Sequence, residues 1–148
     1  MFVILILSTA ALLGNEFSIG VFIHPVLACR DHERFLPAIQ VFAALFGKVM
    51  PFWMVGTLVL HLALLGFSWH WPELSTVLLT AATLLWVAII IFSIIGPVPI
   101  NNRVRAWDLY QLPTDWREQR QRWDRLNAAR VILIALAFLL LVLSYRML

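Results

Sequence analysis

The stretch MFVILILSTAALLGNEFSIGVFIHPVLA, residues 1–28, decides the fold of this chain. It exceeds the roughly 20 apolar residues that an α-helix needs to cross the hydrocarbon core of a bilayer. Glu16 is its only formally charged side chain and lies near its middle. An ionisable group is costly at that depth, so such a residue usually faces a partner or a functional site. The stretch predicts a membrane-spanning helix with a polar group of interest at its centre.

The composition of the whole chain points in the same direction. Of its 148 residues, 62% are hydrophobic and 13% are charged, and the mean hydropathy is +0.89. Soluble domains average about 45–50% apolar and about 25% charged residues. We therefore expect an integral membrane protein in which residues 1–148 form a single domain. A cleaved signal peptide is not expected, because the apolar stretch continues through residue 28 and no basic side chain precedes it.

Three more apolar segments follow, at about residues 49–68, 74–96 and 128–145. Backbone polar groups must be satisfied inside lipid, so the expected fold is all-α, a bundle of four transmembrane helices. Residues 35–47 have helical periodicity and form either an interfacial helix or the start of one long helix bent near Pro51. Pro97 and Pro99 predict that the third helix ends at Gly96 and that an extended segment follows.

The last helix is expected to extend beyond the membrane. Thr114 is a candidate N-cap with Asp115 in the first turn, and the chain can run helically from there to about Arg146. One face of this helix, at offsets 0, 4, 7, 11 and 14, carries Trp116, Arg120, Trp123, Asn127 and Arg130. The pattern predicts a cytoplasmic helical extension with an aromatic and basic stripe.

Basic side chains gather on one side of the predicted bundle. Ten of them lie there, including Arg30, Arg34 and Lys48, whereas the side with both termini has only Arg146. By the positive-inside rule both termini face out and the basic loops are cytoplasmic, in a plasma or inner membrane. Anionic lipid and topology explain the arginines of residues 117–125 more simply than nucleic acid does. The expected partner is therefore membrane lipid, and no nucleic acid is expected.

Two polar residues are predicted at the bilayer midplane. Glu16 and His61 lie near the middle of the first two spans, which run in opposite directions, so the two side chains can meet. Such a pair fits a proton relay, an acid/base couple or part of a metal site, and equally a hydrogen-bonded clasp between helices. A metal site is less favoured, because stable sites usually need three or four protein ligands and only two lie at this depth.

A second polar cluster is expected at the inner leaflet, where the first and third spans end and the fourth begins. Its members are His24, Asn101, Asn102, Asn127 and Arg130, with Trp123 as a wall. Two explanations stay open. The cluster is either a functional pocket or a loop cap in which the asparagine amides satisfy helix-end carbonyls and Arg130 meets lipid phosphate. The chain has no glycine-rich phosphate loop, CxxC pair, HExxH or GxSxG motif, so the common hydrolase, NTPase and zinc signatures are absent.

These residues resemble a known family. The similarity lies in the run IGPVPINNR at residues 95–103 and in the residues that follow it, which are Trp107, Asp115-Trp116, Arg120, Trp123, Asn127 and Arg130. Through them the chain is similar to the family DUF1772, also named anthrone oxygenase-like. The first span also fits the family pattern, through Gly14, Phe17, Gly20 and His24-Pro25. The resemblance therefore covers nearly the whole chain. Asn127 departs from the pattern, because many relatives are expected to carry histidine there, and this puts catalysis through that position in doubt.

The resemblance implies a function, since some fungal members are similar to enzymes that oxidise an anthrone to an anthraquinone with molecular oxygen. The leading hypothesis is a small membrane oxygenase acting on a flat, lipophilic phenolic molecule that enters sideways from the bilayer. His24 would remove a proton, and Asn101, Asn102 and Arg130 would stabilise the enolate oxygen. Residues assigned to substrate binding are Trp123, Asn127, Glu16 and His61. No cofactor is expected, and O₂ is the co-substrate.

Two other functions remain alternatives. The chain could be a non-enzymatic binding or transport component or an accessory subunit, working as a homo-oligomer or with a partner membrane subunit. It could also be a metal- or haem-binding redox protein that uses His24 and His61. The estimated depths place these histidines about two helical turns apart, which argues against shared ligation of one ion.

Overall fold

Long helices make up the computed structural model, which describes residues 1–28 and 32–148. Three residues, Cys29, Arg30 and Asp31, lie outside the described residues. Arg30, which is one of the basic residues counted for the predicted topology, is therefore not placed. In chain order the elements are α1 (Phe2–Ser18), the π-helical turn η1 (Ile19–Ile23), α2 (His24–Ala28), α3 (His32–Gly66), the 3₁₀ turn η2 (Ser68–His70), α4 (Glu73–Ile95), α5 (Pro97–Arg105) and α6 (Trp116–Arg146).

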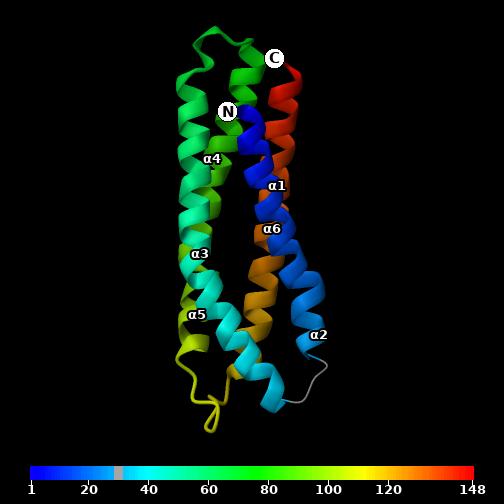
Figure 1. Cartoon of the computed structure of the whole chain (residues 1–148), viewed down its shortest axis with the longest axis vertical. Helices are drawn as coiled ribbons and strands as arrows, with labels where there is room; N and C mark the ends of the chain where they lie inside the picture. Colours follow the sequence, from blue (N-terminus) through cyan, green and yellow to red (C-terminus); the bar gives the residue numbers. More distant parts are fainter. Residues whose placement is uncertain (29–31) are drawn as a thin grey trace.

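Four helical runs are long and apolar enough to cross a membrane. They are Phe2–Val26, Leu36–Gly66, Glu73–Arg105 and Trp116–Arg146. They pack as an elongated bundle in which both termini and the turn around η2 lie at one end (Figure 1). α5, α2 and the loop before α6 lie at the other end. The predicted all-α four-helix membrane bundle with an extended last helix is confirmed.

The core of the bundle forms three apolar clusters along its axis. The cluster nearest the termini contains Leu5, Leu79 and Leu141, and the middle cluster is centred on Trp86. Between α4 and α6, Ser75 and Ser144 each donate a hydroxyl hydrogen bond to the other's carbonyl oxygen, at 2.9 and 2.8 Å. Small hydroxyl residues of this kind let membrane helices approach closely while satisfying their polar groups. The third cluster surrounds the polar residues described below.

α3 is one long helix, which settles the alternative left open by residues 35–47. Pro37 and Pro51 both lie inside it. A proline within a helix removes one backbone hydrogen bond and bends the axis. α3 changes direction in its first half, and this part swings across the end of the bundle that holds α5 (Figure 1).

The segment after Gly96 is helical, so the predicted extended segment is wrong. Gly96, with φ −97° and ψ −89°, separates α4 from α5, and Pro97 begins the new helix. Prolines are tolerated in a first turn because N–H groups there need no intrahelical partner. The end of α5 is held by Gln40 of α3, whose Nε2 donates to the carbonyl oxygens of Val104, at 3.1 Å, and Trp107, at 2.8 Å.

α6 runs without interruption from Trp116 to Arg146, as predicted. Its N-cap is Asp115 and no side-chain capping bond is formed, so the prediction of Thr114 as the cap is wrong. Instead, the Trp116 N–H bonds the carbonyl oxygen of Pro113, and this turn closes the start of the helix. The uncapped start still leaves the predicted aromatic and basic stripe facing the other helices.

Candidate functional site

A cavity of about 200 Å³ lies in the half of the bundle away from the termini, between α1–α2, α3, α4–α5 and α6. Most of its wall is apolar and comes from α3, with further residues from α4 and α5. The polar lining residues are Glu16, His24, Ser93, Asn101, Asn102, Arg120 and Arg130, with the indoles of Trp107, Trp116 and Trp123. The structure therefore gathers polar side chains of separate spans around one space, as the sequence predicts for the inner-leaflet cluster.

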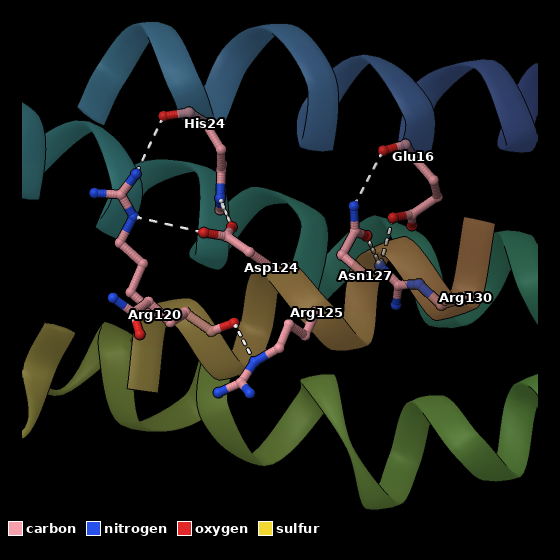
Figure 2. A network of polar contacts seen from close by, with 8 residues as sticks. Glu16, His24, Arg120, Asp124, Arg125, Asn127 and Arg130 are labelled. Carbon is pink, nitrogen blue, oxygen red and sulfur yellow. Dashed lines mark hydrogen bonds and ion pairs between the residues drawn. The ribbon is translucent and has the colours of Figure 1, made fainter. Parts of the chain in front are cut away.

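The π-helical turn η1 aligns the two polar residues of the first span. In a regular α-helix, Glu16 and His24 would point about 80° apart, since they are eight residues apart. A π turn absorbs one extra residue and reduces this difference to about 20°. Both side chains consequently face α6 (Figure 2). Gly20 lies in this turn, where an added Cβ would come within 2.7 Å of Asn127 Nδ2, so the absence of a side chain permits the close approach of α6.

The first group of contacts is a buried ion pair between α1 and α6. Arg130 donates from Nη2 to Glu16 Oε2, and also to Asn127 Oδ1 at 3.0 Å. Asn127 Nδ2 in turn donates to the backbone oxygen of Glu16 at 3.3 Å (Figure 2). Glu16 and Asn127 are 1% exposed and Arg130 is 7% exposed. The pair neutralises two charges that would be strongly unfavourable alone at this depth.

The second group holds His24 between α2 and α6. Its Nδ1 lies 2.8 Å from Asp124 Oδ1, and its ring packs on Trp123 with centroids 4.4 Å apart. Arg120 Nη2 donates to the His24 backbone oxygen at 3.2 Å, and Arg120 Nε lies 4.0 Å from Asp124 Oδ2 (Figure 2). When Nδ1–H donates its hydrogen bond to the carboxylate, the proton stays on Nδ1 and Nε2 is the basic nitrogen of the ring. The arrangement presents an oriented imidazole to the cavity.

Asn101 and Asn102 line the cavity from α5. Their side-chain amides make no hydrogen bond within the described part of the chain, and Asn102 is exposed. The alternative in which these amides cap helix-end carbonyls is wrong, because Gln40 occupies that role at the end of α5. The alternative in which Arg130 meets lipid phosphate is also wrong, because Arg130 is buried against Glu16. The two amides are thus available to a bound molecule.

His61 is not part of this cavity, and the predicted meeting of Glu16 and His61 is not formed. His61 is fully buried, with Nδ1 3.3 Å from Thr83 Oγ1 and its ring stacked on Trp86 at 5.5 Å. Depth along a span could be estimated from the sequence, but depth does not fix the rotation of the helix. Glu16 faces α6, whereas His61 faces α4.

Sequence reasoning missed the partners that orient the predicted residues. The sequence analysis does not single out Asp124, although its spacing of four from Arg120 is a usable signal. Gln40 gave no signal at all, since a lone amide in an apolar helix has many possible roles. Among the residues that the structure describes, no three His, Cys, Asp or Glu side chains are grouped so that they could hold a metal ion.

Comparison with known proteins bears on the same residues. The family model described as anthrone oxygenase matches residues 40–140. This match includes Asn101, Asn102, Trp123, Asn127 and Arg130, whereas Glu16 and His24 precede it. Neither a curated protein nor a solved structure matches the chain. Because the matched region is well over half of the sequence, the chain belongs to the anthrone oxygenase family.

Proposed function

We propose that this protein is a membrane oxygenase that oxidises an activated ring carbon of a lipophilic phenolic molecule with O₂. The observation that carries the proposal is the oriented imidazole of His24, held by Asp124, on a mostly apolar cavity that also presents amide and guanidinium donors. A base, nearby donors and an apolar wall are what the formation of a carbanion from a ring system requires.

The first step of the proposed reaction is a proton transfer. His24 Nε2 takes a proton from a ring CH₂ group that a neighbouring carbonyl has acidified. Asp124 stabilises the imidazolium that results, as a carboxylate does when it orients a catalytic histidine. The electron pair of the broken C–H bond delocalises onto the carbonyl oxygen. Asn101 and Asn102 donate to that developing oxyanion, because their amides have no hydrogen-bond partner among the described residues.

The second step consumes molecular oxygen. The electron-rich carbon transfers electrons to O₂ and a C–O bond forms, which gives a peroxide that takes the proton from the His24 imidazolium. The neutral His24 imidazole then takes the second proton from the same carbon, the electron pair of that C–H bond forms the C=O bond, and the O–O bond breaks to release hydroxide, which takes this proton and becomes water. One oxygen atom remains as a ketone and the other leaves as water, so CH₂ and O₂ become C=O and H₂O. No cofactor takes part in this sequence.

Asn127 does not serve as the base in this proposal. Its amide is engaged with Glu16 on one side and Arg130 on the other, and it is 1% exposed. The departure from the histidine expected in relatives therefore places a structural amide at this position. His24 supplies the base in this chain.

The cavity suits an aromatic guest that arrives through the bilayer. Its volume of about 200 Å³ exceeds the roughly 150 Å³ of an apolar protein cavity that takes up benzene. Pro51, Val55 and Ile94 line the cavity and are also exposed on the outer surface of the bundle, between α3 and α4. We place the mouth for a lipophilic substrate there, since hydrocarbon would cover this surface.

We also propose an orientation in a plasma or inner membrane. Both termini and the turn around η2 share one end of the bundle, which has few basic residues (Figure 1). The loop between α5 and α6 and the arginine-rich start of α6 share the other end. The positive-inside rule then puts the termini outside and the mouth of the site in the cytoplasmic half of the bilayer.

Oxygen uptake by the purified protein with an anthrone tests the proposal. We expect His24→Ala to lower turnover by at least about 100-fold, because a positioned base contributes roughly that much or more. Asn102→Ala and Asp124→Asn should lower kcat with a smaller change in KM. The control is His70→Ala, since His70 is exposed in the turn at the opposite end. Unchanged turnover in both His24→Ala and Asn102→Ala would exclude the assigned roles.

A non-enzymatic binding protein would use the same cavity, and the same assay separates the two functions. A binding protein or accessory subunit would retain the aromatic molecule without consuming oxygen. A partner subunit should then co-purify at a fixed ratio in mild detergent. The engaged Glu16–Arg130 pair favours this alternative, because it shows that part of the polar cluster is an interhelical clasp.

A further inference from the structure

We infer that α6 carries a two-point binding site for oxygen atoms of the ligand, made by the indole N–H of Trp123 and the Nε–H of Arg130. Both residues line the cavity. Both N–H groups are buried, and neither has a hydrogen-bond partner within the described residues. The inference deepens the proposed function and rests on it for the aromatic nature of the ligand.

Unpaired buried donors of this kind call for an explanation. The large majority of buried polar groups in folded proteins are hydrogen-bonded, because an unmade bond costs about 1–3 kcal/mol. Other buried side-chain atoms without a partner, Asn15 Nδ2, His61 Nε2 and Gln119 Oε1, belong to residues that do not line the cavity. The donors of Trp123 and Arg130 instead share one cavity and one helix face. A common bound molecule accounts for both.

Surrounding contacts hold the two donors in place. The Trp123 indole packs against the His24 ring and is 8% exposed. The Arg130 guanidinium is fixed through Nη2 by Glu16 and Asn127, and its buried Nε–H has no partner among the described residues. Asn127, between them on the same face, bonds the Glu16 backbone oxygen and Arg130 Nη2, and it bonds neither the Trp123 indole N–H nor the Arg130 Nε–H. The site is therefore preorganised for acceptors that the described residues do not supply.

The spacing defines the class of ligand. Trp123 and Arg130 are seven residues apart, which is about two helical turns or roughly 10 Å along the axis of α6. Donors at two levels of α6 fit a ligand with oxygen atoms at two positions. An extended ring system meets this requirement, with a phenolate or carbonyl oxygen at Arg130 and a second oxygen at Trp123. This pose brings the end of the ligand beside Trp123 next to the His24 ring.

Equilibrium binding of two non-reacting probes tests the inference without any turnover. The probes are 1,8-dihydroxyanthraquinone and anthracene. They share a fused three-ring carbon skeleton, and only the first carries oxygen atoms. Trp123→Phe keeps an aromatic ring and removes the N–H. It should weaken binding of the dihydroxyanthraquinone by about 3- to 10-fold, the effect of one net hydrogen bond, and leave anthracene binding unchanged.

The matched control is Trp53→Phe, because the indole N–H of Trp53 bonds Ser8 Oγ at 3.0 Å outside the cavity. It should change neither affinity. Arg130→Lys, which keeps the charge opposite Glu16, should also weaken only the oxygenated probe. Equal losses for both probes, or no loss for either, in Trp123→Phe would overturn the inference. Absent oxygen uptake together with the predicted binding pattern would overturn the proposed function and leave this site standing.

Discussion

At the scale of single residues, the carboxylate of Glu16 inside the predicted membrane span is paired with the guanidinium of Arg130. Glu16 comes from the first span and Arg130 from the last, so the pair also links α1 to α6. Such pairs add little stability compared with well-packed apolar residues, but removing one partner strands the other charge. We therefore expect that loss of either partner of the Glu16–Arg130 pair destabilises the fold and disturbs the cavity.

Glu16→Gln tests this expectation. The substitution leaves the Arg130 guanidinium buried without a counter-charge, so we expect a loss of about 3–5 kcal/mol of unfolding free energy. Glu73→Gln is the control, since Glu73 is exposed at the start of α4, and its effect should stay within about 0.5 kcal/mol. Thermal or denaturant unfolding in detergent measures both. Equal stability of the two variants would show that the buried pair carries no such weight.

At the scale of elements, the π-helical turn η1 decides which residues can cooperate. It rotates Glu16 and His24 onto the face that meets α6, and Gly20 within it allows Asn127 to approach. α6 supplies Asp124, Asn127 and Arg130 as the matching face. A regular helix in place of η1 would direct one of the two polar residues away from α6.

Two glycine substitutions in the first span compare this close approach with open space. A Cβ at position 20 would lie 2.7 Å from Asn127 Nδ2, whereas a Cβ at Gly14 would have nothing within 4 Å. Gly20→Ala should therefore lower the unfolding free energy by about 1–3 kcal/mol through overpacking. Gly14→Ala should be neutral or slightly stabilising, because alanine favours helix. Unfolding curves of the two variants that coincide would contradict the role assigned to Gly20.

The elements also show which parts of the molecule the sequence could predict. Apolar runs fix the existence of four spans, and the periodicity after Trp116 fixes the long last helix. Helix rotation is different, because it depends on contacts between distant segments. This is why His61 was placed beside Glu16 and why Asp124 was missed as a partner of His24. The extended segment predicted from Pro97 and Pro99 is wrong because prolines that end one helix can equally begin the next.

At the scale of the whole molecule, the cavity has a polar side against α6 and an exposed apolar side between α3 and α4. In the proposed function, a substrate would enter sideways from the bilayer through the apolar side and reach His24 last. Val55 and Ile94, 52% and 60% exposed, mark the mouth. The apolar lining residues along α3 would form the path of this molecule.

Val55→Trp tests this path. A bulky side chain at the mouth should obstruct access and lower kcat/KM about tenfold or more in proteoliposomes loaded with substrate. The control is Leu139→Trp, because Leu139 is also 52% exposed but belongs to α6 and does not line the cavity. Ile94→Trp should behave like Val55→Trp. If both mouth variants kept the kcat/KM of the control, the substrate would have to arrive by another route.

We propose that this cavity inserts oxygen from O₂ into a bound ring, with His24 as the base. Turnover of an anthrone under ¹⁸O₂, followed by mass spectrometry of the product, tests it most directly. The intact protein should place one ¹⁸O atom in the new ketone and release the other as water, and His24→Ala should yield almost no labelled product. Unlabelled ketone from the intact protein, or equal labelling by His24→Ala, would contradict the claim.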